Sequence, residues 1–168
     1  DSLRWLAALI SDTGMRLAEA VGLSKNDLNI TDEVPHVVIR KYPWRPLKTS
    51  RSERTIPLVG AALWASQRLS DTVSGQFLFP QYVDGISTNA NSASAALNKW
   101  MKTFLPKECV VHGMRHAFRD RLRAVNAPTD MIDQLGGWVK TSIGQNYGEG
   151  FYLESCKSTL DLMLQSYG

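Results

Sequence analysis

Hydrophobic residues recur at helical spacing at the start of the chain. Leu3, Leu6, Ala7 and Ile10 follow the pattern of an amphipathic helix, and the polar segment 12–14 interrupts it. The same periodicity predicts further helices over residues 15–21, 61–69, 89–104, 112–125, 128–135 and 153–164. The chain is therefore predicted to be mainly helical.

Several residues mark the ends of these helices. Gly22 follows the second helix as a C-cap glycine, and Asn89 or Asn91 can cap the helix that runs to about Phe104. Pro128 suits a first helical turn because its missing N–H is not needed there. The inner face of the helix before Phe104 is predicted to carry Ala96, Leu97, Trp100, Met101 and Phe104.

Two short runs rich in β-branched residues predict strands over residues 36–40 and 54–58. The segment 24–33 before them is polar and rich in turn-forming residues. Pro57 places the second strand at an edge of a sheet or at its own end, because proline cannot donate to the ladder. The predicted fold class is therefore α+β, mainly α with a small antiparallel β-sheet.

Composition narrows the class of protein. With 168 residues, 43% hydrophobic and 21% charged, the chain fits one soluble globular domain. A net charge of +3 permits a nucleic-acid partner without demanding one. Cys109 and Cys156 make neither a disulfide framework nor a zinc site, and free thiols in a reducing compartment are expected. We find no signal peptide and no apolar run long enough to span a bilayer.

Residues 13–19 form a candidate anion site. Gly14 lets the backbone turn sharply, and Arg16 follows at a predicted helix start, where free N–H groups favour an anion. Glu19, one turn later, can hold the Arg16 guanidinium in place. Taken alone, the pair favours the interpretation as a surface ion pair that contributes little to stability.

A cationic loop joins the two predicted strands. Between residues 40 and 54 a single carboxylate, Glu53, faces six cations. These cations are Arg40, Lys41, Arg45, Lys48, Arg51 and Arg54. The Ser and Thr side chains among them suit phosphate contacts, and a lysine at the tip can donate a proton to a leaving oxygen. A solvated hairpin explains the loop equally well.

The stretch 112–147 carries the residues most typical of a reaction centre. His112 and Arg115 share a face of a predicted helix, and a guanidinium can bridge two phosphate oxygens. Trp138 offers an indole N–H that donates at any pH, and Tyr147 is a candidate nucleophile. Each also has an ordinary interpretation as a structural histidine, a core tryptophan or a packed tyrosine.

In combination, these motifs resemble the catalytic domain of the tyrosine recombinases, the phage integrase family. That family shows an arginine in Thr-Gly-x-Arg-x-x-Glu, a lysine on a β-hairpin, a His-x-x-Arg motif, a His or Trp after Leu-Gly, and then a tyrosine. The matching residues are Arg16, Lys48, His112, Arg115, Trp138 and Tyr147. The resemblance runs from about Thr13 to Tyr147 and implies the integrase catalytic fold. Trp138 replaces the more usual histidine. This replacement keeps an N–H donor, but the indole cannot gain or lose a proton as an imidazole can.

The resemblance implies a strand-transfer reaction that needs neither a cofactor nor a metal. Tyr147 would attack a DNA phosphodiester in line and form a 3′-phosphotyrosyl intermediate with a free 5′-hydroxyl. Arg16 and Arg115 would clamp the non-bridging oxygens, and Trp138 would add a neutral hydrogen bond. Preorganised cations would take the place of magnesium.

The resemblance also implies the remaining roles. Lys48 would protonate the leaving 5′-oxygen, His112 would help to move the tyrosine proton, and Glu19 would support Arg16. The residues expected to bind DNA are Arg45, Arg51, Arg54 and Arg119.

By the same resemblance, the function is site-specific DNA recombination in phage or genomic-island integration and excision. Residues 1–168 would be the C-terminal catalytic domain, with the N-terminal core-binding domain absent from this chain. The expected partners are a double-stranded recombination site, further copies forming a tetramer on DNA, and accessory directionality or DNA-bending proteins. No membrane partner is expected, and the location would be the bacterial cytoplasm, at the nucleoid.

Two alternatives remain open for the function. One is a type IB topoisomerase, which relaxes DNA by the same tyrosine chemistry, and the other is a DNA-binding module that has lost catalysis. The apolar C-terminal segment from Phe151 onward could pack on its own domain or on a neighbouring protomer.

Overall fold

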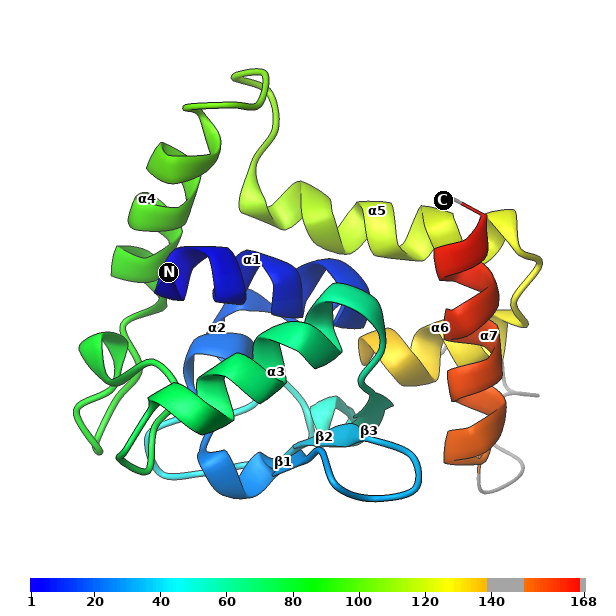
Figure 1. Cartoon of the computed structure of the whole chain (residues 1–168), viewed down its shortest axis with the longest axis horizontal. Helices are drawn as coiled ribbons and strands as arrows, with labels where there is room; N and C mark the ends of the chain where they lie inside the picture. The colour runs from blue at the N-terminus through cyan, green and yellow to red at the C-terminus, as the bar shows by residue number, and fades with distance from the viewer. Residues whose placement is uncertain (139–149, 167–168) are drawn as a thin grey trace.

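The computed structural model describes residues 1–138 and 150–166, without the side chain of Arg51. Within them, seven α-helices pack with a three-stranded antiparallel sheet that lies along the lower side of the molecule in Figure 1, which confirms the predicted α+β class. The helices are α1 (Ser2–Thr13), α2 (Leu17–Val21), α3 (Gly60–Thr72), α4 (Ala90–Met101), α5 (Val111–Ala124), α6 (Thr129–Gly136) and α7 (Leu153–Gln165). No helix in this part of the chain combines the length and the apolar character that crossing a bilayer requires.

Helix α1 lies at the centre of the fold, between α3 on one side and α5 on the other (Figure 1). Leu6 and Ile10, two residues of the predicted apolar stripe, are at most 1% exposed, and Leu9 is also fully buried. Phe118 and Leu122 of α5 are also fully buried. The core therefore forms where the apolar stripes of these helices meet, and it holds α1 and α5 side by side.

Gly14 ends α1 and allows α5 to approach closely. Its φ of 64° is left-handed, and its N–H donates to the carbonyl oxygen of Ile10. A Cβ at this position would lie 2.3 Å from the ring of Phe118, so a larger residue would clash as well as strain the backbone. This turn brings the segment after α1 next to α5.

The sheet has the order β1-β2-β3, with strands β1 (Leu28–Asn29), β2 (His36–Ile39) and β3 (Arg54–Pro57). Strand β2 pairs with β3 in the register Val37 to Ile56 and Ile39 to Arg54. Pro57 is the last residue of β3, which is an edge strand, so both interpretations of this proline hold. Strand β1 was not predicted, because two residues are too few to show an alternating pattern.

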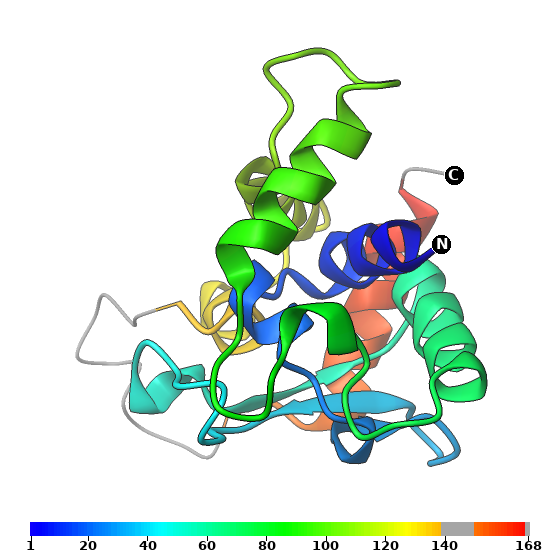
Figure 2. The ribbon, with the colours of Figure 1, turned by 90° about the vertical axis from the view of Figure 1, so that its left-hand side faces the viewer.

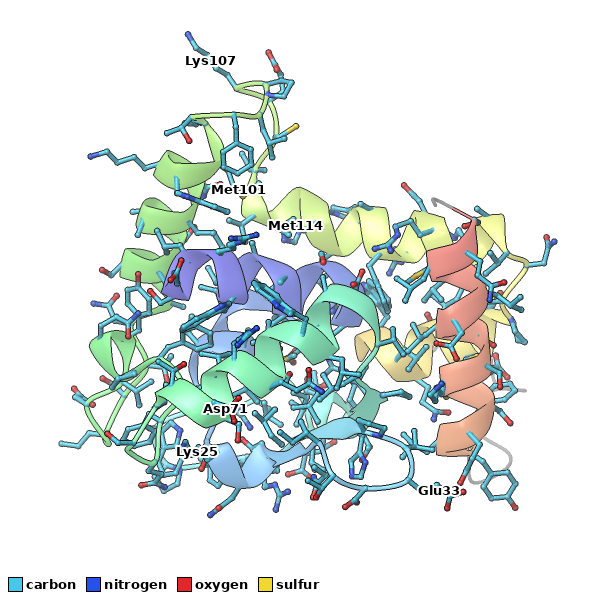
Figure 3. All side chains as sticks on the ribbon, in the orientation of Figure 1. Lys25, Glu33, Asp71, Met101, Lys107 and Met114 are labelled. Carbon is cyan, nitrogen blue, oxygen red and sulfur yellow. The ribbon has the colours of Figure 1, made fainter. Side chains whose placement is uncertain are left out.

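Helix α4 ends earlier than the sequence predicts. Asn89 caps it by accepting from the N–H of Ser92 at 3.0 Å, but the helix stops at Met101. Phe104 therefore lies beyond the helix and is 57% exposed, so its predicted place on the inner face is wrong. The chain after α4 projects from the body, with Lys107 at its outer end (Figures 2 and 3).

Helix α7 packs on its own domain. Cys156, Leu160 and Met163 are at most 1% exposed, and the helix contacts β3 and α5. Within the single chain, the C-terminal helix thus completes the core of its own domain.

Candidate active site

Arg16 and Glu19 form a closed local unit. The helix that the sequence places from residue 15 begins at Leu17, and Arg16 is its N-cap. Glu19 accepts from the backbone N–H of Arg16 at 2.9 Å and from Arg16 Nη1 at 3.0 Å. Arg16 Nη2 also donates to the carbonyl oxygen of Gly137 at 3.2 Å. The Arg16 side chain keeps 27% exposure, so part of its guanidinium stays accessible.

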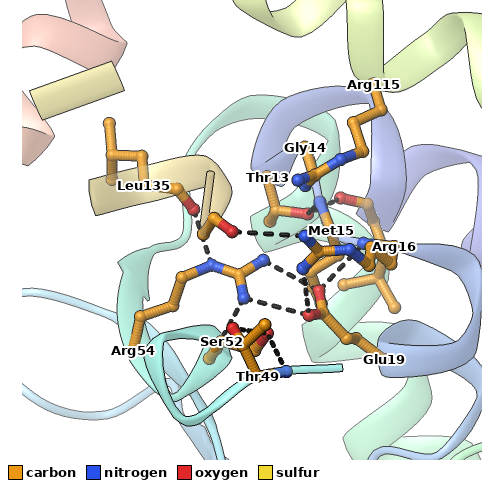
Figure 4. Close-up of polar contacts among 12 residues, drawn as sticks. Thr13, Gly14, Met15, Arg16, Glu19, Thr49, Ser52, Arg54, Arg115 and Leu135 are labelled. Carbon is orange, nitrogen blue, oxygen red and sulfur yellow. Dashed lines mark hydrogen bonds and ion pairs between the residues drawn. The ribbon is translucent and has the colours of Figure 1, made fainter. Parts of the chain in front are cut away.

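Glu19 lies between two guanidinium groups (Figure 4). Arg54 Nη2 is 2.8 Å from Oε2 of Glu19, and Arg54 Nη1 is 3.1 Å from Oε1. Both of these side chains are only 4% exposed. Burial raises the pKa of Glu19, but hydrogen bonds and charge from Arg54, and then from Arg16, outweigh it. The pKa of Glu19 therefore lies below its usual value, and the carboxylate stays charged.

Arg115 reaches the same region from α5. Its Nη1 donates to the carbonyl oxygen of Gly14, at the turn where α1 ends. The side chain is buried, and its Nη2 has no hydrogen-bond partner among the described residues. Burial, followed by the charges of Arg16 and Arg54, lowers the pKa of Arg115 to about 9. The group is still charged at neutral pH, and a buried N–H is left free to bind an acceptor.

A hollow of about 400 Å³ opens where these segments meet. Arg16, Lys48, His112 and Arg115 all line it, although they come from the start of α2, the β2–β3 loop and α5. Four of the six catalytic candidates are thus brought to one place. Such a cluster of cations around one hollow suits a phosphate group.

The described residues contain no cluster of three His, Cys, Asp or Glu side chains suited to a metal ion. The donors that line the hollow are guanidinium, ammonium and imidazole groups, together with the amide of Asn91 and the hydroxyl of Ser94.

Comparison with known proteins identifies the family. The chain matches the sequence profile of the phage integrase family over residues 2–152. The chain belongs to the phage integrase family. No curated protein sequence is significantly similar to it.

Solved structures of the Tn1549 transposon integrase have the same fold. A complex with circular intermediate DNA matches with a TM-score of 0.59 and 20% identity, over 94% of this chain and 57% of that chain. A complex with transposon right-end DNA matches with a TM-score of 0.55 and 20% identity, over 93% and 57%. The chain therefore spans less than two thirds of the length of the integrases it resembles.

In this member of the phage integrase family, the guanidinium of Arg115 lies over the ring of Trp138. The guanidinium carbons of Arg115 and Arg119 are 4.2 and 4.0 Å from the centre of its ring. A Cβ on Gly136 would come within 1.8 Å of the Trp138 ring, so a larger residue at this position would displace the ring. Among the described residues, the lining of the hollow includes Arg115 but not Trp138.

Arg45 does not fit the DNA contact expected from the sequence. It is 1% exposed and donates to the carbonyl oxygens of Glu19 at 3.1 Å and Arg40 at 2.6 Å. It also lies 3.6 Å from a carboxylate oxygen of Asp27. Its guanidinium thus holds the β2–β3 loop against α2, and no surface remains for a phosphate.

Arg54 needs the same correction, because its guanidinium is buried against Glu19 and two backbone carbonyls. Arg119 is half-buried against Trp138 and remains a candidate for DNA contact. The side chain of Arg51 and the whole of Tyr147 lie outside the described residues.

Sequence reasoning missed two polar residues of the hollow. Asn91 and Ser94 line it from α4, three residues apart on one face of the helix. Asn91 was considered only as a helix cap, a role that Asn89 takes. A polar i, i+3 pair on a surface helix is too common to signal a site by itself.

Proposed function

We propose that this chain is the catalytic domain of a site-specific recombinase, which cuts and rejoins duplex DNA through a 3′-phosphotyrosyl intermediate on Tyr147. The observation that carries the proposal is the convergence of Arg16, Lys48, His112 and Arg115 on one hollow. These residues come from three separate segments, and their meeting in the fold is not required by packing alone. The phage integrase family membership supports the same conclusion.

The charge balance of the site favours a phosphate. Three guanidinium groups, those of Arg16, Arg54 and Arg115, face a single carboxylate, Glu19. The cluster therefore carries a positive excess that burial makes costly, and a bound anion would relieve it. The free Nη2 of Arg115 offers a hydrogen bond to such an anion.

We assign the steps of the reaction as follows. The Tyr147 oxygen bonds to phosphorus while the bond from phosphorus to the 5′-oxygen breaks, and Lys48 gives that oxygen a proton. His112 assists removal of the tyrosine proton. Arg16 and Arg115 stabilise the charge that grows on the non-bridging oxygens. Attack by a 5′-hydroxyl of a partner strand reverses these steps, so the phosphodiester bond energy is kept.

Trp138 contributes to the same reaction. Its ring supports the Arg115 guanidinium at 4.2 Å, which limits the rotation of that side chain. Its indole N–H is the neutral donor that we assign to a non-bridging oxygen.

The proposed partner is a double-stranded recombination site, and the proposed assembly is a homotetramer on that DNA, with accessory directionality or DNA-bending proteins. The Tn1549 integrases that share the fold are bound to DNA. We further propose that a core-binding domain preceding residues 1–168 completes the grip on the duplex, and that the protein works at the bacterial nucleoid.

A suicide substrate with a nick beside the cleavage point tests the proposal. Cleavage releases a short fragment that carries the free 5′-hydroxyl, and once this fragment has diffused away the covalent complex cannot be religated. The wild-type protein should give a covalent protein–DNA band, and Tyr147→Phe should give none. Tyr152→Phe is the matched control, since Tyr152 is an exposed tyrosine five residues further on. Loss of the band in Tyr152→Phe but not in Tyr147→Phe would identify Tyr152 as the nucleophile and leave the reaction class unchanged.

Products from two marked duplexes separate recombination from the alternatives. Exchange of strands between the duplexes supports the proposal, relaxation alone supports a topoisomerase, and binding without any covalent band supports a non-catalytic module.

A further inference from the structure

Arg54 joins three segments that surround the hollow. Its Nε donates to the carbonyl oxygen of Leu135 at 2.8 Å, at the end of α6. Its Nη1 donates to the carbonyl oxygen of Ser52 at 2.7 Å, in the loop that carries Lys48. Its Nη1 and Nη2 pair with the two carboxylate oxygens of Glu19 (Figure 4). A single buried guanidinium thus ties α2, α6 and the β2–β3 loop together.

We propose that Arg54 is a positioning residue that fixes the orientation of the Arg16 guanidinium. This inference rests on the function proposed above. Arg16 makes two side-chain hydrogen bonds, to Glu19 at 3.0 Å and to the carbonyl oxygen of Gly137 at 3.2 Å. Both of these acceptors are themselves held by Arg54.

The first acceptor is held directly. Arg54 binds both oxygens of Glu19, including Oε1, which also accepts from Arg16. The carboxylate cannot rotate without breaking a charge-assisted hydrogen bond to one of the two arginines. The direction of the Arg16 guanidinium therefore depends on where Arg54 holds Glu19.

The second acceptor is held through the end of α6. Arg54 binds the carbonyl oxygen of Leu135, two residues before Gly137. A Cβ on Gly137 would lie 2.7 Å from Arg54 Nη1, so the guanidinium lies directly against this backbone. Gly137 also has a left-handed φ of 65°, which sets the direction of its carbonyl group.

The contacts require an arginine and place it away from DNA. A planar guanidinium can serve two carbonyls and both carboxylate oxygens at once, whereas a lysine ammonium is a point charge with fewer fixed directions. The Arg54 side chain is 4% exposed, and its donors are occupied by Glu19 and by two carbonyl oxygens. Arg54 therefore acts through Arg16 and does not contact the substrate.

Arg45 provides a matched control. It is an equally buried arginine near the same loop and also donates to Glu19, but to the main-chain oxygen at 3.1 Å. Arg45→Lys should weaken the fold without disturbing the carboxylate that holds Arg16. A loss of activity caused only by lower stability would appear in both variants.

The experiment measures the single-turnover rate of covalent complex formation on the nicked substrate, at a temperature where circular dichroism shows each variant to be folded. Arg54→Lys should be slower than wild type by about 100-fold, the loss expected from a misplacement of about 1 Å. Arg45→Lys should keep the wild-type rate. Arg54→Gln, which keeps one amide donor for Glu19, replaces Arg54→Lys if that variant does not fold.

A double-mutant cycle identifies the residue through which Arg54 acts. In an Arg16→Ala background, Arg54→Lys should cause no further loss, because there is no guanidinium left to orient. A further loss of rate of about 100-fold in the Arg16→Ala background would overturn the inference. So would equal rates for Arg54→Lys and Arg45→Lys in the wild-type background. Neither result would contradict the proposed function. A wild-type protein that forms no covalent complex would overturn the proposed function, and the inference with it.

Discussion

The side-chain amide of Gln134 pairs with the backbone of Phe151 as a neighbouring strand would. Its Nε2 donates to the carbonyl oxygen of Phe151 at 3.0 Å, and the N–H of Phe151 donates to its Oε1 at 2.8 Å. A Cβ on Gly150 would lie 2.6 Å from the same Oε1, and Gly150 has a left-handed φ of 84°, so a larger residue would displace the Gln134 amide and strain the backbone. Helix α6 thus fixes the chain four residues after Tyr147, immediately before α7.

Gln134→Glu should destabilise the protein, because a carboxylate can still accept from the N–H of Phe151 but cannot donate to its carbonyl oxygen. We expect a loss of about 1–3 kcal/mol in the free energy of unfolding, measured by urea denaturation. Gln81→Glu is the control, since Gln81 is exposed. Equal stability of the two variants would show that the pairing contributes nothing.

Glu19→Gln should make the free energy of unfolding less dependent on pH in the acid range. The pKa of Glu19 lies below its usual 4.5, so its carboxylate stabilises the fold above that pH, and the contribution is lost as the pH falls through the folded-state pKa. At pH 7 the variant should be less stable by about 3 kcal/mol, because the buried guanidinium of Arg54 and the partly exposed one of Arg16 lose their charged partner. Urea denaturation at several pH values should show this gap closing below pH 4.5. A gap that stays constant down to pH 3 would contradict the ion-pair interpretation.

Lys48→Ala should slow cleavage of an ordinary phosphodiester by about 10²–10⁴-fold, the usual contribution of a general acid. On a substrate with sulfur in place of the bridging 5′-oxygen, the loss should largely disappear, because a thiolate leaves without a proton. Single-turnover rates on both substrates measure the effect. Lys41→Ala is the control, since Lys41 is also an exposed lysine but does not line the 400 Å³ hollow. An equal loss on both substrates would exclude Lys48 as the proton donor.

Arg115→Ala should weaken DNA binding to a similar extent on every sequence, because the proposed contact is to a phosphate. The slope of log K against log salt should fall in magnitude by about one. Lys157→Ala should leave the slope unchanged, because Lys157 on α7 is already paired with Asp161, whose Oδ2 lies 2.7 Å from the lysine Nζ. Titration of fluorescent DNA at four salt concentrations gives both slopes. An unchanged slope for Arg115→Ala would mean that this guanidinium does not bind the backbone.

The sequence predicts the helices well because their apolar residues repeat every 3.6 positions. The pattern predicts α1, α5 and α7 nearly to their ends, and the two longer strands are predicted by their β-branched residues. It fails where an element is too short, as for β1, or where a helix stops without a strong signal, as before Phe104. The periodicity of apolar residues indicates which face of a helix is buried, but it does not indicate the residue at which the helix ends.

The site shows a different limit. The motifs that contain Arg16, Lys48, His112 and Arg115 are local, and the fold places these residues around one hollow. The loop cations were harder to assign, because the sequence shows that an arginine is charged but not what lies opposite it. The carboxylate that holds Arg54 is 35 residues away along the chain. Only the folded structure distinguishes this buried arginine from one that faces DNA.

Mass spectrometry of the covalent complex tests the central claim most directly. Trypsin should release the peptide between Lys140 and Lys157, which contains both Tyr147 and Tyr152, so fragmentation must locate the bound nucleotide. We predict that the nucleotide is attached to the phenolic oxygen of Tyr147 through its 3′-phosphate. A nucleotide on Tyr152, or attachment through a 5′-phosphate, would contradict the proposed chemistry.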